Sequence, residues 1–195
     1  MKPLLSPYLR RRRMEPVRPY LKGNILDIGC GTGELVHFVD EDQRYCGIDS
    51  NTWLVRKLRE TYPQHAFYDK NLDEEPLNLG EKFDTITLVA VIEHLYNPRN
   101  LLRQCKNLLS DKGHIVITTP TAIGGKLHKF LARLRLTDRY AAREHKRFYG
   151  HDEIKAVLPC DLEIEKYQKF QFGMNQLFVC KHSGSFRQDS SESKA

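Results

Sequence analysis

Short apolar runs alternate along this chain with segments in which apolar residues recur every three or four positions. The runs predict strands at residues 25–28, 44–49, 64–68, 83–89, 114–118, 162–170 and 176–180. The helical spacing predicts helices at 52–61, 100–109 and 150–158, with another helix starting at Glu34. The runs 25–28 and 83–89 are nearly continuous in apolar residues, so they fit central parallel strands that are covered on both faces.

The first predicted strand breaks into the sequence Gly29-Cys30-Gly31-Thr32-Gly33. The glycines permit positive φ and lack the Cβ atoms that would hold a ligand away from the backbone. Asp27, at the end of the strand, would be costly to bury alone, so a ligand or nearby donors must contact its carboxylate. We therefore predict that this turn is the floor of a small-molecule site.

The spacing of these glycines argues against two common nucleotide sites. In the dinucleotide fingerprint G-x-G-x-x-G, counted from Gly29, the sixth position here is Glu34. The Lys and Ser/Thr pair of a P-loop is also missing. Because an acidic residue at the start of the helix would repel a pyrophosphate, the sequence predicts a nucleoside-like ligand without phosphates.

Residues 25–33, ILDIGCGTG, resemble the first motif of the class I S-adenosylmethionine-dependent methyltransferases. Further matches are GIDS at 47–50, FDTI at 83–86 with VIEHL at 91–95, and LLSDKGHI at 108–115. The resemblance implies a Rossmann-like α/β fold. Its sheet would have seven mostly parallel strands in the order 3-2-1-4-5-7-6, with helices on both faces and the seventh strand antiparallel.

Four predicted strands end near polar side chains, those of Asp27, Asp49, Asp69 and His94. Ligands of open α/β sheets bind outside the carboxyl ends of the strands, so these side chains should converge on one crevice. Asp49 lies 20 residues beyond Gly29 and can accept both hydroxyls of a ribose. By the resemblance, Asp69 would accept from the adenine amino group, although Asp is also common in ordinary turns. Asp27 would orient the ammonium group, directly or through water.

The resemblance implies S-adenosylmethionine as cofactor and S-adenosylhomocysteine as product. The predicted cofactor-binding residues are Asp27, Gly29, Cys30, Gly31, Thr32, Gly33, Asp49, Ser50, Asp69, Lys70, Asn71, Ala90 and Val91. Cys30 has no adjacent base, so a structural role is favoured over that of a nucleophile. Trp53 recurs at helical spacing with Leu54 and Leu58, which favours a place in the core over stacking on the ligand.

Methyl transfer from a sulfonium has a good, neutral leaving group, so much of the catalysis can come from alignment of the reactants. A hydroxyl or amine acceptor must still lose a proton, and histidine is well suited to take it near neutral pH. His94 is the first candidate base, and His145, His151 and Tyr149 are second candidates. The alternative is that His94 only bonds to the backbone and holds the end of its strand.

Glu93 and His94 also resemble part of the E-x-x-E-H metal motif found in small-RNA 2′-O-methyltransferases and some ubiquinone-pathway O-methyltransferases. The position of the first glutamate is occupied here by Ala90. Because only two potential ligands remain, we predict no metal site.

The net charge of the 195 residues is +6, and its distribution is uneven. Residues 1–22 and residues 121–149 each carry a net charge of +6, and the rest carries −6. We predict a basic leader at 1–22, a methyltransferase domain at 23–182 and a disordered polar tail at 183–195.

Within residues 121–149 a basic amphipathic helix is predicted, with Leu127, Phe130, Leu131 and Leu134 on one face. A lid over the acceptor is the first interpretation. Peripheral membrane contact through 126–136 and an oligomer contact are the alternatives.

The expected function is methyl transfer to an O or N atom of a small-molecule, glycan or lipid-linked acceptor, which the basic segments suggest is anionic. One alternative is a nucleic-acid methyltransferase, although the chain shows no RNA-binding module. Another is a non-catalytic protein that binds S-adenosylmethionine. Five scattered cysteines, no signal-type segment and no spanning run predict a soluble, cytoplasmic protein with reduced thiols. The oligomeric state is not predicted.

Overall fold

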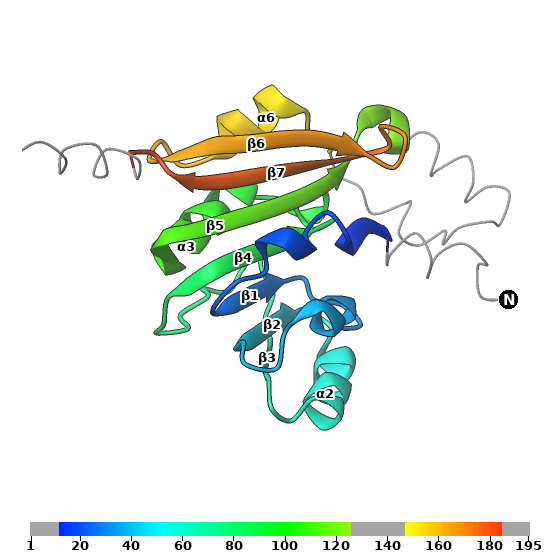
Figure 1. Cartoon of the computed structure of the whole chain (residues 1–195), viewed down its shortest axis with the longest axis vertical. Coiled ribbons are helices and arrows are strands. Elements are labelled where there is room, and N and C mark those ends of the chain that lie inside the picture. Colours follow the sequence, from blue (N-terminus) through cyan, green and yellow to red (C-terminus); the bar gives the residue numbers. More distant parts are fainter. Residues whose placement is uncertain (1–11, 126–146, 185–195) are drawn as a thin grey trace, which may run out of the picture.

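A computed structural model of the chain describes residues 12–125 and 147–184 and shows one seven-stranded sheet (Figure 1). The strands are β1 (Ile25–Ile28), β2 (Tyr45–Asp49), β3 (Ala66–Asp69), β4 (Phe83–Val89), β5 (Leu109–Pro120), β6 (Leu162–Phe170) and β7 (Asn175–His182). Their order is β3-β2-β1-β4-β5-β7-β6. In this order the first five strands, β3, β2, β1, β4 and β5, are parallel to one another, and β7 is antiparallel to both of its neighbours. The predicted fold class and strand order are confirmed.

Helices cover both faces of the sheet, as predicted. They include the α-helices α2 (Thr52–Thr61), α3 (Pro98–Leu108) and α6 (His151–Val157) and the short 3-10 helices η1 (Arg18–Tyr20), η2 (Glu34–Phe38) and η3 (Ile92–His94). Side chains of α3 and α6 pack on one face, with Leu26 and Ile28 of β1. Side chains of α2, η2 and the segment before β1 pack on the other, with Ile25. All four residues of β1 are buried, as a central parallel strand requires.

The helix expected to start at Glu34 is a short 3-10 helix, Glu34–Phe38. Two other local expectations were wrong. Residues 110–113, between the predicted helix 100–109 and the predicted strand 114–118, lie within β5 as a bulge, between Leu109 and His114, which pair with Phe83 and Thr85 of β4. Trp53 is 65% exposed, because the buried side of α2 is formed by Val55 and Leu58 instead.

Part of the predicted leader contributes to the core. Val17 is fully buried and Leu21 nearly so. The backbone after Val17 is attached to the sheet, since the Thr85 hydroxyl on β4 donates to the Tyr20 carbonyl oxygen at 2.7 Å. Residues 1–11, most of the predicted lid including its amphipathic stretch, and residues 185–195 lie outside the described ranges. The predicted domain limits therefore stay predictions.

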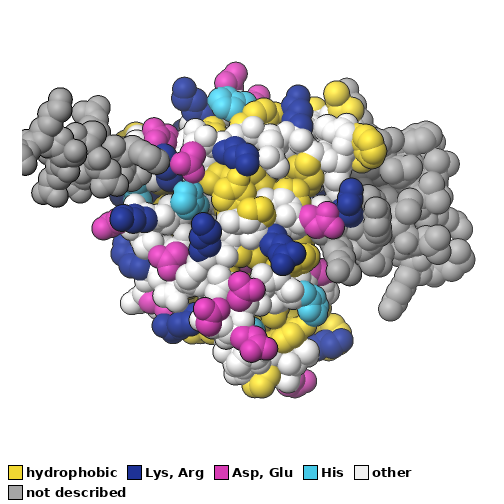
Figure 2. Space-filling model, viewed as in Figure 1, with side chains coloured by type: hydrophobic (Ala, Val, Ile, Leu, Met, Phe, Trp, Pro, Cys, Tyr) yellow, Lys and Arg dark blue, Asp and Glu magenta, His cyan; other side chains and the backbone are white. Residues whose placement is uncertain are grey.

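The surface of the described ranges mixes charges of both signs on the face seen in Figure 2. Within those ranges no helix is long and apolar enough to cross a membrane. Hydrophobic side chains also reach the surface at the upper right of the view, where the β6–β7 hairpin ends.

Candidate functional site

The glycine turn after β1 is held against β2. The backbone N–H groups of Gly29 and Cys30 both donate to the Ile48 carbonyl oxygen, at 2.7 and 2.9 Å. Gly29, Gly31 and Gly33 all have positive φ. The turn therefore depends on glycine for its backbone path.

The three glycines differ in what surrounds them. A Cβ atom on Gly29 would lie 2.4 Å from Val91 Cγ2, and one on Gly33 would lie 2.6 Å from Leu58 Cδ2. A Cβ atom on Gly31 would have no neighbour within 4 Å. Close packing thus requires glycine at the outer two positions. The middle one leaves open space where a ligand can approach the backbone. Both predicted reasons for glycine, positive φ and room for a ligand, therefore apply to Gly31, and only the first applies to Gly29 and Gly33.

Asp49 lies at the carboxyl end of β2 and links the two strands at the turn. Its Oδ2 accepts from the Gly31 N–H at 2.8 Å, and its Oδ1 accepts from the Asn51 N–H at 2.9 Å. A carboxylate has about four acceptor positions, so roughly two remain for other donors. This geometry fits the two hydroxyls of a ribose placed beside Gly31. Thr32 and Ser50, predicted to contact the same ligand, are exposed at this edge.

Asp27 is buried and satisfied by protein donors. Tyr45 Oη donates to its Oδ2 and Thr87 Oγ1 to its Oδ1, both at 2.7 Å. Burial raises the pKa of Asp27 to about 6, and the two hydrogen bonds oppose that rise. The sequence left open whether a ligand or nearby protein donors contact the Asp27 carboxylate, and the structure shows that protein donors do. Contact with an ammonium group stays a prediction.

Asp69 lies at the end of β3, opposite Asp49 in the register of the two strands. Its carboxylate accepts from Arg59 Nη2 at 3.3 Å, and hydrogen bonding lowers its pKa. The N–H of Lys70 donates to the Asp49 carbonyl oxygen, and the N–H of Asn71 donates to Glu75 Oε1. These backbone donors already have acceptors in the protein. Contact of Asp69, Lys70 and Asn71 with adenine stays a prediction.

The exit of β4 contacts the turn from the other side. Ala90 has a φ of 57°, an uncommon value for a residue with a Cβ, and its N–H donates to the Thr118 carbonyl oxygen. Val91 packs on Gly29, and the His94 N–H donates to the Val91 carbonyl oxygen. His94 is half-buried. The ends of β1, β2, β3 and β4 thus bring Asp49, Asp69 and the Ala90–His94 segment to the edge where Gly31 is open.

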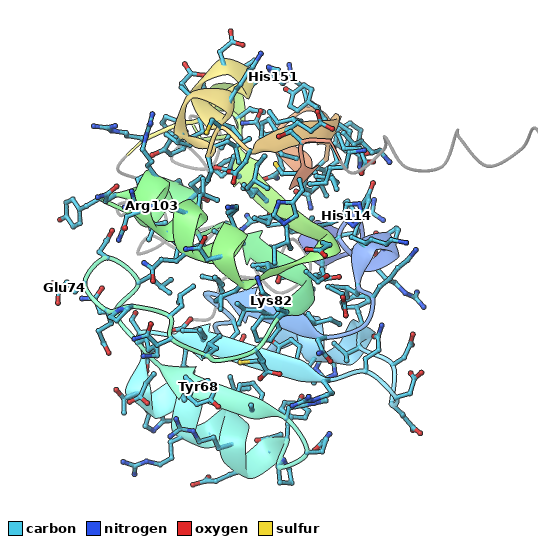
Figure 3. The ribbon with its side chains drawn as sticks, turned by 90° about the vertical axis from the view of Figure 1, so that its left-hand side faces the viewer. Tyr68, Glu74, Lys82, Arg103, His114 and His151 are labelled. Atoms are coloured by element: carbon cyan, nitrogen blue, oxygen red, sulfur yellow. The ribbon has the colours of Figure 1, made fainter. Side chains whose placement is uncertain are left out.

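The remaining candidates fall in different places. His145 lies outside the described residues. Tyr149 is 4% exposed and packs in the core with α3 and α6. His151 is at the start of α6, where its ring contacts those of Tyr167 and Phe178. Figure 3 shows His151 at the opposite end of the molecule from Tyr68 of β3. Catalytic roles for His145, Tyr149 and His151 stay predictions.

The cysteines of the described ranges are unpaired, and four of them are buried. Burial, reinforced by the charges of Asp27 and Asp49, raises the pKa of Cys30 far above its ordinary range. Its thiol therefore stays protonated, which agrees with the structural role favoured from the sequence. Among the residues that the structure describes, no group of three or more His, Cys, Asp or Glu side chains could hold a metal ion.

Sequence reasoning did not single out Tyr45 or Thr87. Tyr45 and Thr87 reach Asp27 only through the register of β1 with its two neighbours, which no local pattern reveals. Glu93 was considered only as a metal ligand, yet it is fully buried. A charged residue within the apolar run Val91-Ile92-Glu93 was the available signal.

Comparison with known proteins finds a family model, Methyltransferase domain, that matches residues 5–158. The ubiquinone biosynthesis O-methyltransferase of Glaesserella parasuis is 35% identical over 105 residues, which are 49% of this chain and 44% of that protein. The tRNA U34 carboxymethyltransferase of Aliivibrio fischeri is 31% identical over 147 residues, 71% of this chain and 43% of that protein. The chain thus spans less than half the length of these relatives.

Among solved structures, the plantazolicin methyltransferase BamL, in complex with a triazolic desmethylPZN analog and SAH, has the same fold. The TM-score is 0.70 with 15% sequence identity, covering 90% of this chain and 86% of that one. At this identity the likeness concerns the fold alone.

Proposed function

Because this chain belongs to the family of class I S-adenosylmethionine-dependent methyltransferases, we propose that it methylates an O or N atom of a small-molecule, glycan or lipid-linked acceptor. S-adenosylmethionine is the cofactor of this family. The observation that carries the proposal is the Asp49 carboxylate beside the open backbone of Gly31, at the edge where the five parallel strands end.

The residues present fit this cofactor. Asp49 has acceptor capacity left for the ribose hydroxyls, and Gly31 leaves space next to its backbone for the methionine part. Asp27, Asp69 and the Ala90–Val91 exit complete the proposed contacts. When bound, S-adenosylmethionine supplies an electrophilic methyl group on a sulfonium. The protein's part is to hold the acceptor atom in line with that group, remove water and accept a proton.

The acceptor is proposed to be anionic because residues 1–22 and residues 121–149 are both strongly basic. The segment 121–149 follows β5, whose carboxyl end is at the same edge of the sheet as Asp49, and carries a net charge of +6. We assign it the role of a lid that attracts the acceptor.

The cofactor assignment is tested by calorimetry of S-adenosylhomocysteine binding to wild type, Asp49→Asn and Asp49→Ala. We expect Asp49→Ala to weaken binding by roughly ten- to a hundredfold, because a hydrogen bond to a charged group contributes about 1.5–3 kcal/mol. Asp49→Asn should lose less, since one oxygen remains.

Asp42→Ala is the matched control for Asp49→Ala. Asp42 is exposed and precedes β2, at the opposite edge of the sheet from Asp49. Its loss should leave the affinity unchanged. Equal affinity of Asp49→Ala and wild type would contradict the ribose assignment.

Transfer itself is tested with radiolabelled methyl donor and a fractionated metabolite extract. Incorporation of label into an anionic, non-polymeric fraction supports the proposal. If the wild type binds S-adenosylhomocysteine but labels nothing, the non-catalytic alternative is favoured.

A nucleic-acid acceptor is the second candidate, favoured by the match to the tRNA-modifying relative and by the two basic segments. Binding through phosphates weakens steeply as salt rises. Weak, salt-insensitive binding of tRNA and absence of label in the RNA fraction would exclude this candidate.

A further inference from the structure

Glu93 is a fully buried carboxylate in η3, directly after the exit of β4. Its Oε2 accepts from the Thr119 hydroxyl on β5 at 3.0 Å. Its Oε1 is buried and has no hydrogen-bond partner among the described residues. Buried carboxylate oxygens are normally satisfied, so this atom needs an explanation by a ligand, a water or a catalytic role.

The position of Glu93 relates it to the cofactor floor. Val91, two residues earlier, contacts Gly29 of the turn, and the His94 N–H donates to the Val91 carbonyl oxygen. Glu93 therefore lies two residues beyond the contact with Gly29, in the segment that follows the carboxyl end of β4. The carboxyl ends of the parallel strands form the edge where the site of methyl transfer is proposed.

Groups from several elements act on the Glu93 carboxylate. Burial raises its pKa, while a hydrogen bond from its own backbone, the neighbouring His94 and Arg13, and the hydrogen bond from Thr119 lower it. Burial also raises the pKa of Tyr149; the nearby Arg147 opposes that rise and the Glu93 charge adds to it. A buried carboxylate with a raised pKa is a stronger proton acceptor than an exposed one.

We propose that Glu93, and not His94, is the general base that takes the proton from a hydroxyl group of the acceptor. This inference rests on the proposed function. The acceptor oxygen forms a bond to the methyl carbon as the carbon–sulfur bond breaks, and the O–H proton moves to Glu93 Oε1. The sulfonium becomes a neutral thioether, and Glu93 is left as a carboxylic acid that returns the proton to solvent. The acceptor is accordingly an alcohol or phenol.

The main test compares wild type with Glu93→Gln, which keeps the size of the side chain but cannot take the proton. The probe is the extract fraction that wild type labels, used in serial dilution with radiolabelled methyl donor from pH 5 to 9. We expect at least a hundredfold lower maximal rate, no acid limb in the pH profile, and affinity for S-adenosylhomocysteine within twofold of wild type.

Thr119→Val provides a second test that does not depend on changing Glu93. Loss of the hydroxyl removes a hydrogen bond that favours the ionised carboxylate, so the acid limb should move to higher pH. A purely structural role for Glu93 gives no such movement. Glu163→Gln, an exposed glutamate on β6, is the matched control and should keep the wild-type rate and profile.

The outcomes separate this inference from the proposed function. If wild type labels an acceptor and Glu93→Gln keeps its rate and acid limb, Glu93 is not the base and the proposed function stands. If His94→Asn loses the acid limb while Thr119→Val leaves it in place, His94 is the base and the inference is overturned. If wild type labels no acceptor, the proposed function fails and this inference fails with it.

Discussion

Asp27 and Asp49 show how one residue type takes two roles at the scale of single side chains. Both end strands of the same parallel sheet, yet Asp27 is buried between two hydroxyl donors and Asp49 is bound only by backbone N–H groups. The buried carboxylate holds β1 to its neighbours, and the half-buried one has acceptor positions left for a ligand. Burial and donor geometry, not residue type, therefore set how many acceptor positions each carboxylate has left.

The Asp27 carboxyl predicts a specific dependence of stability on pH. Its pKa rises from 3.8 to about 6 in the folded protein, so between these values the folded state binds more protons than the unfolded state. Its contribution to stability is therefore full below about pH 4 and is lost as pH rises to about 6. The loss corresponds to roughly 3 kcal/mol. Asp27→Asn should remove this decline.

Urea unfolding of wild type and Asp27→Asn at pH 4, 5, 6 and 7 measures the difference between the two proteins. The comparison cancels the opposite contributions of carboxylates with lowered pKa, such as Asp161 and Glu165. The exposed Asp42→Asn variant should follow wild type. A constant difference between wild type and Asp27→Asn across the four pH values would contradict the assignment.

At the scale of elements, local signals account for α3 well. The Asn97 side chain accepts from the Asn100 N–H at 3.2 Å, and Pro98 occupies the first turn, where its missing N–H costs no hydrogen bond. Its buried side chains are Pro98, Leu101, Leu102 and Cys105. The β5 region shows the opposite case. Residues 110–113 have turn-type composition, but they form a bulge within β5 between Leu109 and His114, which both pair with β4.

Asn97→Ala should lower the free energy of unfolding by about 1 kcal/mol, because the capping acceptor at the start of α3 is lost. Denaturant unfolding at neutral pH measures this change. Asn107→Ala, an exposed position near the end of the same helix, should change stability by less than about 0.5 kcal/mol. Equal losses in the two variants would mean that the cap contributes nothing.

At the scale of the whole molecule, the sheet needs cover on both faces, and the segment before β1 supplies part of it. Val17 packs with Ile25, Val116 and Val179, which come from three different strands. The matched family model also begins before this segment, at residue 5. The basic charge of the region and the apolar contact of Val17 are thus two separate properties of one stretch of chain.

Val17→Ala should destabilise the protein by about 2 kcal/mol, through lost apolar burial and the cavity that remains. Thermal unfolding, with and without S-adenosylhomocysteine, measures the loss. Val39→Ala, at a half-buried position, should cost less. A Val17→Ala protein as stable as wild type would show that this segment does not contribute to the core.

The sequence by itself determined the strand order through the family resemblance, and it predicted that the site lies at the glycine turn and the strand-end carboxylates. The predicted place of the site follows from local patterns, since apolar runs, glycine spacing and strand-end acids involve residues that are close in the chain. Only the tertiary structure decided that Asp27 is satisfied by Tyr45 and Thr87, that Trp53 faces solvent, and that Glu93 is buried with one oxygen unpartnered in the described ranges. Each of these depends on strand register or on which side of an element meets its neighbour, and both are properties of residues far apart in the chain.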